Sequence, residues 1–469
     1  MAMLEDSCPL LVDVASTPTR ASAQILTNES APRQVTHQCR RCACTAGSPS
    51  DSVAVRPSRQ GLQFTFDSAA LPHLPTDAMA WRDLRIIQRL GLRVPLFQAP
   101  MAGAQASDLA IAVARGGGLG AIPCALLSPD SVREHVRHFR AATSDMSAPI
   151  NLNFFCHTLP PANSAADKQW QDILAPYYRE YGVDLAHLTA KGALRMPFDE
   201  VSLELVKELK PEVVSFHFGL PAPHMLQGVK DTGAYVISTA TSVREARWLE
   251  KRGCDAIIAQ GIEAGGHRGV FLPREGGSNA CHKQFRNSSM DFPRQIGTMS
   301  LVPQIVDAVK LPVIATGGIG DARGVLAASA LGAAAVQMGT IFLLANETKT
   351  SALHRKMLQA AAAAGDEVIE TAITNIFSGR PARGFVTRVM RDLGPMCSAA
   401  PDFPTAGAPL GALKKAAEAN GDTAFTSLWS GQSPGFAKEK SAEIIVRSLI
   451  EELDAMVATI STTKTHSSL

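Results

Sequence analysis

The chain has 469 residues, a length that suits one large domain or roughly two to three ordinary ones and is sufficient to bury a sizeable core. Apolar residues make up 46% and charged residues 19%, with a formal net charge of +2, so neither a disordered protein nor a nucleic-acid binder is indicated. We find neither a membrane-spanning apolar run nor a signal peptide, and we expect a cytoplasmic protein that binds a small molecule.

Residues 1–78 differ in composition from the rest of the chain. They are rich in Ser, Thr, Ala, Pro and Arg, lack a sustained hydrophobic period and are predicted to be disordered. Between positions 13 and 51 the one acidic residue is Glu29, which is typical of an organelle transit peptide, although acidic residues at the very start argue against targeting. The CRRCAC segment at 39–44 could bind a metal, but unpaired reduced thiols are favoured and no metal site is predicted.

From position 94 onward, short apolar runs alternate with segments of helical period, as a parallel sheet with crossover helices requires. Strands are expected at 94–98, 119–123, 150–155, 213–218, 235–239, 256–260, 313–316 and 334–338. Helices are expected at 108–115, 129–141, 242–251, 301–309 and 321–331. Eight strand–helix pairs predict an α/β fold, a closed (β/α)8 TIM barrel over 79–345, with a doubly wound open sheet as the alternative.

Other stretches depart from the simple repeat. Residues 163–197 insert helical sequence after the third strand, and residues 268–298 form a long loop after the sixth. Loops of that length in a compact domain are usually functional. Beyond 345 the pattern becomes helical and irregular, which predicts a helical cap at 346–455 and a disordered tail at 456–469.

The last two strand ends are rich in glycine, and in such a barrel the active site lies at the C-terminal ends of the strands. TGGIGDARG at 316–324 follows the seventh strand, and QMGT at 337–340 follows the eighth. Glycines let backbone N–H groups approach a phosphate, and the helix that begins near Asp321 adds its positive end. Tight turns without a ligand are the structural alternative. The predicted phosphate site consists of Gly317, Gly318, Gln337, Met338, Gly339 and Thr340.

The sixth strand ends in QGIEAGGHRG at 260–269. Gly265 and Gly266 would bring the backbone close to a planar ring, and Gln260 supplies an amide donor and acceptor. His267 is the side chain here that can move protons near neutral pH. This segment therefore predicts a catalytic histidine beside a ring-shaped ligand.

Weaker candidates follow the first, third and fourth strands. Met101 lies in APMAG at 99–103, and Asn151 and Asn153 share one face of the third strand, where amides could face the barrel mouth. His157 and His217 are each about as often structural as functional. HExxH and Walker A sequences are absent, and the glycine run at 116–120 precedes a strand, which is the wrong order for a dinucleotide fold.

Together and in this order, these segments resemble the nitronate monooxygenase family, also called 2-nitropropane dioxygenases, and specifically its class I branch. The resemblance covers about 82–435 and extends through SFHFGLP at 215–221, FSGRPARG at 377–384 and LWSGQ at 428–432. Family members bind FMN in a (β/α)8 barrel and oxidise alkyl nitronates with O2 to a carbonyl compound and nitrite. The resemblance implies that FMN is bound by Met101, Asn153, Gln260, Gly265, Gly318 and the residues from Gln337 to Thr340, with His267 catalytic.

Several alternatives stay open at this level. His267 could take the α-proton of a nitroalkane, or it could hold the nitronate oxygens. An FMN-dependent NAD(P)H:quinone or enoyl-thioester reductase would share the barrel and the glycine turns. A flavin-free phosphate-binding lyase or synthase, and a non-catalytic scaffold, are rivals of other classes. Substrate preference is open, because the loop at 272–298 is long and three of the four tyrosines cluster at 177–181. The expected partners are a nitronate or nitroalkane and O2, and a homo-oligomer is left open.

Overall fold

The computed structural model describes residues 81, 83–184, 195–273, 295–364 and 369–466. The predicted disordered extension at 1–78, the CRRCAC segment and most of the predicted loop at 268–298 lie outside the described residues.

The described part of the chain contains an eight-stranded parallel sheet in the order β1-β9-β8-β6-β5-β4-β3-β2. A parallel bridge between Phe97 and Leu119 joins the two ends of this order, with Leu119 N–H donating to Leu96 O at 2.8 Å. The sheet is therefore a barrel, as predicted, and the open-sheet alternative is wrong. Its strands are β1 (Leu96–Gln98), β2 (Gly120–Pro123), β3 (Ile150–Phe155), β4 (Val213–His217), β5 (Tyr235–Ala240), β6 (Ala256–Gln260), β8 (Val313–Thr316) and β9 (Ala335–Met338).

The barrel strands are buried on both faces, which explains why each was recognisable as a short apolar run. Phe97, Ile237 and Ile314 belong to one interior cluster. Ile86 and Leu90 of α1 (Arg85–Leu90) join that cluster together with the first residues of several strands, so α1 covers the N-terminal end of the barrel. The opposite, C-terminal end is left for the functional site.

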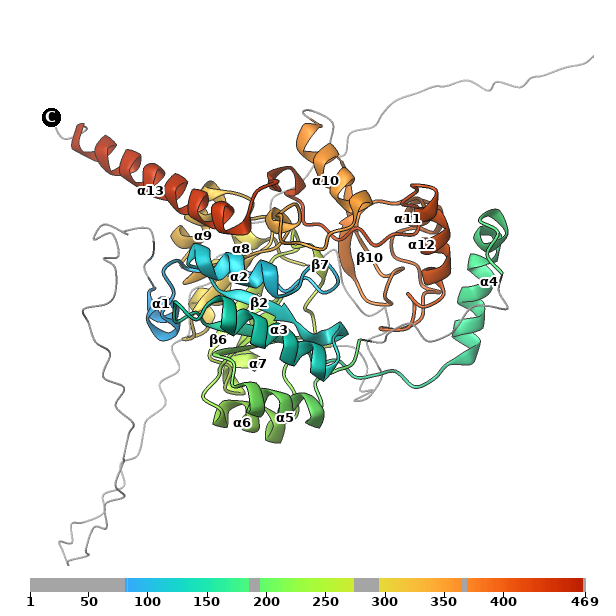
Figure 1. The fold of residues 1–469 in the computed structure, drawn as a ribbon, viewed down its shortest axis with the longest axis horizontal. Helices are drawn as coiled ribbons and strands as arrows, with labels where there is room; N and C mark the ends of the chain where they lie inside the picture. The colour runs from blue at the N-terminus through green and yellow to red at the C-terminus, as the bar shows by residue number, and fades with distance from the viewer. Residues whose placement is uncertain (1–80, 82, 185–194, 274–294, 365–368, 467–469) are drawn as a thin grey trace, which may run out of the picture. The chain divides into compact units, whose positions relative to one another are not determined.

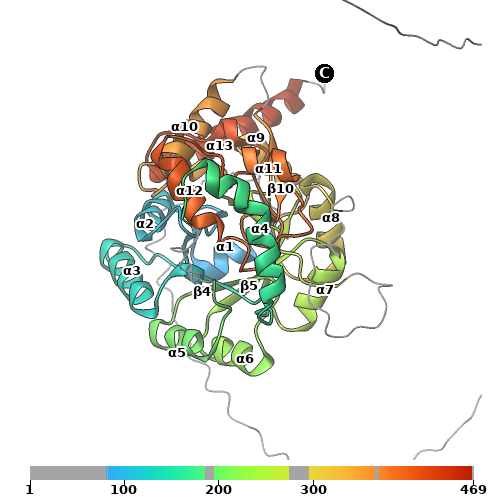
Figure 2. The same cartoon turned by 90° about the vertical axis from the view of Figure 1, so that its right-hand side faces the viewer.

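A ring of helices surrounds the barrel (Figure 2). Ser128, Ser242 and Asp321 cap α3, α7 and α9 by accepting backbone N–H groups. The crossover helices are α2 (Ser107–Gly116), α3 (Pro129–Ala142), α5 (Glu200–Leu209), α6 (Pro223–Asp231), α7 (Val243–Lys251), α8 (Thr298–Ala308) and α9 (Ala322–Ala330).

The last helix of the ring comes from the far end of the chain. α13 (Ala442–His466) packs against α2 and α9 (Figure 1). Gly116 permits this approach, because a Cβ there would lie 2.7 Å from Cβ of Val446. The prediction that 442–455 belongs to the cap differs from this arrangement, because these residues lie in the helix ring. The predicted disordered tail is wrong for 456–466, which continue the helix. The buried apolar residues of α13 between Ala442 and Leu453 explain its place in the ring, since helix packing acts between residues distant in sequence.

Between β9 and α13 the chain forms a cap that is only partly helical. A three-stranded antiparallel sheet in the order β10-β11-β7 combines two cap strands with β7 (Gly266–His267), which belongs to the loop after β6. The other cap elements are η5 (Thr340–Phe342), α10 (Ala352–Ala363), β10 (Thr371–Thr374), β11 (Ala382–Phe385), α11 (Arg388–Leu393), α12 (Leu410–Ala419) and η6 (Pro434–Phe436).

The insertion after β3 forms α4 (Ser164–Glu180), which packs on the cap (Figures 1 and 2). The clustered tyrosines make these contacts: Tyr178 donates to Pro409 O at 2.9 Å, and Tyr177 donates to Asp392 at 3.0 Å. Tyr181 donates to Asp422 at 2.5 Å. These tyrosines therefore attach α4 to the cap.

Among the described helices none is long and apolar enough to span a membrane. The described residues also contain no cluster of three or more His, Cys, Asp or Glu side chains arranged to hold a metal ion.

Candidate active site

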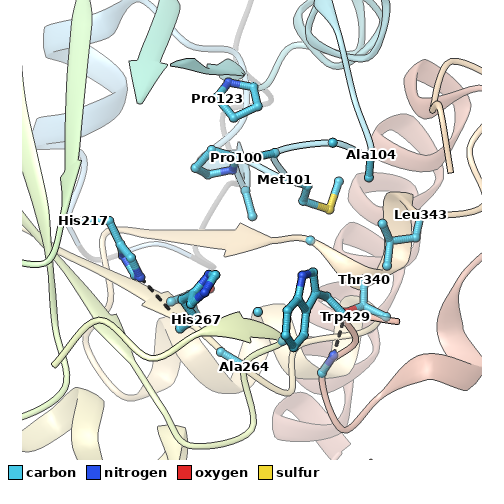
Figure 3. A pocket seen from close by; sticks show the side chains of 18 of the residues that line it. Pro100, Met101, Ala104, Pro123, His217, Ala264, His267, Thr340, Leu343 and Trp429 are labelled. Carbon is cyan, nitrogen blue, oxygen red and sulfur yellow. Dashed lines mark hydrogen bonds between the residues drawn. The ribbon is translucent and has the colours of Figure 1, made fainter. Parts of the chain in front are cut away.

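A cavity of ≈ 450 Å³ lies at the C-terminal ends of the barrel strands, between the barrel and the cap (Figure 3). It is lined by every predicted site residue: Met101, Asn153, Gln260, Gly265, Gly266, His267, Gly317, Gly318, Gln337, Met338, Gly339 and Thr340. His217 also lines the cavity, whereas Asn151 and His157 do not. The fold therefore gathers residues that are up to 239 positions apart, as the difference 340 − 101 shows.

The two glycine turns of the predicted phosphate site are adjacent. β8 and β9 are neighbouring strands, and Thr316 Oγ1 donates to Gln337 O at 2.8 Å. Gly317 and Gly318 have φ values of +115° and +71°, in the region that favours glycine. Within the described part of the chain, the backbone N–H groups of Gly317, Gly318 and Gly339 donate no hydrogen bond. These turns thus present free donors at a surface that lines the cavity.

The cap segment around Ser430 fixes both turns. Gly431 N–H donates to Thr340 Oγ1 at 3.0 Å, and Ser433 Oγ donates to Gly318 O at 2.8 Å. A Cβ on Gly265 would lie 2.5 Å from Gly431 N, so glycine is required there by backbone packing. The sequence indicated a nearby ring as the reason for glycine at 265. The close approach of the cap backbone is a second reason for glycine at this position.

The contribution predicted for the helix after β8 differs in the structure. Asp321 caps α9 by accepting from the N–H groups of Arg323 and Gly324 at 3.0 and 3.2 Å. Its carboxylate already satisfies donors that an anion would use. A phosphate at these turns would therefore depend on the glycine N–H groups rather than on the end of α9.

The side-chain amide of Gln260 forms hydrogen bonds mainly with the loop that carries His267. Its Oε1 accepts from Gly269 N–H at 2.8 Å, and its Nε2 donates to His267 O at 3.0 Å. His217 Nε2 also lies 3.2 Å from His267 O, a carbonyl that can only accept, so Nε2 of His217 carries the proton (Figure 3). The loop is held further by Arg268, which is fully buried and donates to the carbonyl groups of Gln260 and Gly261. Gln260 keeps one amide hydrogen for a ligand.

His267 is placed by the cap sheet. β7 pairs with β11, which sets His267 opposite Ala382, and Arg268 N–H donates to Pro381 O at 2.9 Å. Its Nε2 lies 2.9 Å from Ser378 Oγ. Aromatic rings surround the imidazole, with centroids 5.3 Å away at Phe403 and 5.7 Å away at Trp429.

Burial holds the pKa of His267 well below its ordinary value, and nearby positive charges, Arg195 first, act in the same direction. The same two causes, with Arg380 as the main charge, lower the pKa of His217 to about 3 and that of His157 to about 4. Arg380 is itself buried, and its guanidinium lies 3.8 Å from the ring centre of Phe218. All three histidines are therefore neutral at physiological pH.

The described residues that line the cavity include positive but no negative side chains. Arg195, Lys349 and Lys414 line it, and no aspartate or glutamate is among its described lining residues. A low-dielectric cavity with this charge distribution favours anionic ligands.

The residues present fit a flavin phosphate and ring. The glycine turns offer free N–H donors, and Gln337 is buried with an Oε1 that has no partner among the described residues. Asn153 Nδ2 donates to Ser215 Oγ at 2.9 Å, which orients its amide at the cavity wall. The side chain of Met101 lies over Gly339, since a Cβ on that glycine would be 3.5 Å from Sδ.

Sequence analysis missed Ser378, Trp429 and Arg195. The first two lie in FSGRPARG and LWSGQ, which contributed to the family resemblance without being given a site role. Arg195 lies in the insertion after β3, where no motif marks it.

Comparison with known proteins identifies the family of this chain. A sequence model of the family described as "Nitronate monooxygenase" matches residues 84–453. A nitronate monooxygenase from Pseudomonas aeruginosa is 38% identical over 370 residues, which cover 79% of this chain and 99% of the relative. The chain belongs to the nitronate monooxygenase family. A second family member, from Paraburkholderia phytofirmans, is 36% identical and aligns over 78% of this chain and 94% of its own length.

Solved structures of other enzymes superpose on this chain. A nitroalkane oxidase from Streptomyces ansochromogenes superposes with a TM-score of 0.68 at 31% identity, covering 80% of this chain and 99% of its own. FabK from Thermotoga maritima superposes with a TM-score of 0.56 at 25% identity, covering 81% and 99%. The protein is therefore an oxidoreductase of the nitronate monooxygenase family.

Proposed function

We propose that the protein oxidises alkyl nitronates with O2, using bound FMN, to give a carbonyl compound and nitrite. The observation that carries this proposal is that the two glycine turns and His267 line one cavity whose described lining residues include no carboxylate. That arrangement supports a phosphate-anchored cofactor at one end and an anionic substrate beside the histidine at the other.

The glycine turns would hold the FMN phosphate through the N–H groups of Gly317, Gly318 and Gly339, with the Thr340 hydroxyl as a further donor. Asn153, Gln260 and Gln337 would meet the polar edge of the flavin, while Met101 and the backbone at 265–266 would lie against its ring. When bound, FMN supplies the redox chemistry, accepting an electron from the nitronate and passing it to O2.

The substrate would be the nitronate anion, because Arg195, Lys349 and Lys414 line the cavity without a compensating carboxylate among the described residues. Phe155 and Trp429 line the same space beside His267 and would exclude water from the reacting carbon. His267 would contact the substrate itself, since it alone in this corner combines access from the cavity with a titratable ring next to both aromatic walls.

The proposal is tested by purifying the protein, recording its absorption spectrum and mixing it with an alkyl nitronate in air. A flavin spectrum with nitronate-dependent O2 uptake and nitrite release is expected. A colourless protein that does not bind added FMN would refute the cofactor. Flavin that is bleached rapidly by NADH without O2, with no turnover of nitronates, would instead identify a reductase.

A further inference from the structure

The hydrogen bonds around Ser378 determine which nitrogen of His267 carries the proton. Ser378 is fully buried, and its Oγ has three neighbours. Oγ donates to Arg380 O at 3.1 Å, accepts from Arg380 N–H at 3.3 Å, and lies 2.9 Å from His267 Nε2. A hydroxyl group has one hydrogen and two lone pairs, so each of these contacts uses one of them.

The carbonyl group of Arg380 decides where the hydroxyl hydrogen of Ser378 points. A carbonyl oxygen can only accept, so the single hydroxyl hydrogen must point to Arg380 O; otherwise two oxygen acceptors would face each other at 3.1 Å without a proton between them. Ser378 Oγ is then an acceptor toward His267. Nε2 of His267 must therefore carry a hydrogen, and Nδ1 of a neutral ring must hold a lone pair.

The turn that presents Ser378 leaves it little freedom. Gly379 has a φ of +84°, and a Cβ there would lie 2.2 Å from Pro401 O. Gly379 N–H also donates to Asn375 O at 2.7 Å. The hydroxyl is thus held by backbone groups of the cap, while His267 is held by the pairing of β7 with β11.

Nδ1 of His267 is the ring atom left for a ligand. Among the described residues Nδ1 forms no hydrogen bond. It is also too accessible to count among the buried polar atoms that lack a partner. Because His267 lines the cavity while its Nε2 contacts the fully buried Ser378, we assign Nδ1 to the cavity side of the ring.

We propose that Ser378 is a positioning residue that fixes His267 as the Nε2–H tautomer, so that Nδ1 meets the substrate as a proton acceptor. This inference rests on the proposed function for its chemical consequence. A neutral nitroalkane would lose its α-proton to Nδ1, and the C–H electron pair would move onto the nitro group to form the nitronate. A substrate that enters as a nitronate would receive a hydrogen bond from Nδ1 only after that atom had taken up a proton.

The direct test is ¹⁵N NMR of the purified protein labelled at histidine, because protonated and unprotonated ring nitrogens have distinct chemical shifts. His267→Gln assigns the two signals of interest among the 12 histidines. We expect a protonated Nε2 and an unprotonated Nδ1 in the native protein. A protonated Nδ1 with a bare Nε2 would overturn the proposal, whatever substrate the enzyme uses.

Variants test the role of the hydroxyl. Ser378→Ala should shift the ring toward a mixture of tautomers and lower kcat/KM for a neutral nitroalkane by about tenfold, the equivalent of one hydrogen bond. Ser378→Thr, which retains the hydroxyl, should restore the tautomer signal. Ser329→Ala is the matched control, since it removes a buried hydroxyl of α9 that has no partner among the described residues. Unchanged ring-nitrogen shifts in Ser378→Ala would refute the positioning role. If the tautomer is as expected but nitronates are not oxidised, the proposed function fails and the assignment stands.

Discussion

The two ends of the cavity are built in different ways. The glycine-turn end consists mostly of backbone groups that follow two adjacent strands, β8 and β9, and the chain segments involved are only about twenty residues apart. The histidine end joins a loop after β6 to a cap turn, and His267 and Ser378 are 111 positions apart in the sequence. A local motif can specify the first end, whereas the second exists only when the cap has folded onto the barrel.

This contrast predicts separable functions. Changes at the glycine turns should act on cofactor affinity, and changes at the cap turn should act on turnover. The cap segment at 431–433 contacts the glycine turns as well, so the cap joins the two ends in addition to the barrel, in which Gln260 of β6 pairs with Thr316 of β8.

The largest effect is expected at the histidine. His267→Ala should lower turnover of a neutral nitroalkane by roughly two to four orders of magnitude, because the group that would receive the α-proton is lost. The protein should stay yellow, since the glycine turns are untouched. Steady-state kinetics and the absorption spectrum measure the two properties, with His138→Ala on α3 as a control outside the cavity. Normal turnover in His267→Ala would remove the histidine from the mechanism.

Gly379→Ala should disrupt the cap turn that carries Ser378, and so act on His267 indirectly. The new Cβ would collide with Pro401 O and require a strained backbone, which costs on the order of 1–3 kcal/mol. Ser378 and His267 would be displaced together. We expect kcat to fall well below the native value while the dissociation constant of FMN, measured by fluorescence titration, changes less than threefold. A variant that loses FMN but keeps its turnover when FMN is saturating would contradict the division between the two ends.

Thr340→Val tests the opposite end. It replaces the hydroxyl that accepts from Gly431 N–H with a methyl group of similar size, and it also removes a donor to the phosphate. FMN affinity should weaken by about tenfold, since a net hydrogen bond contributes roughly 0.5–1.5 kcal/mol. Turnover at saturating FMN should be nearly native. Thr350→Val is the matched control in the same cavity. Equal loss of FMN in both variants would show that the phosphate does not depend on the turn after β9.

The last prediction concerns acid stability rather than the site. Burial and the Arg380 charge lower the pKa of His157 to about 4, against an ordinary value near 6.5. Between these two values the unfolded chain binds the proton and the folded chain does not, so the free energy of unfolding falls as the pH falls from about 6.5 toward 4. His157→Phe should remove about 1.4 kcal/mol per pH unit of that loss. Urea unfolding at pH 7 and at pH 5 measures the difference, and equal pH slopes for the variant and the native protein would refute it.

The sequence by itself determined the barrel strands and the glycine turns. Every predicted barrel strand is present, with ends that differ by at most two residues, as at β1. These strands were recognisable because each is a short apolar run buried on both faces. The grouping of Gly318, Thr340 and His267 in one cavity also followed from the rule that strand ends meet at one face of a barrel. Their roles toward a cofactor stay predictions.

Only the tertiary structure decided the surroundings of His267, the three-stranded sheet of the cap and the position of α13. β7 has two residues and no sequence pattern, because its pairing partner β11 lies far along the chain. Likewise α13 takes the last place in the helix ring through contacts with α2 and α9. Periodicity records which face of a segment is buried, but it does not record the segment against which that face is buried.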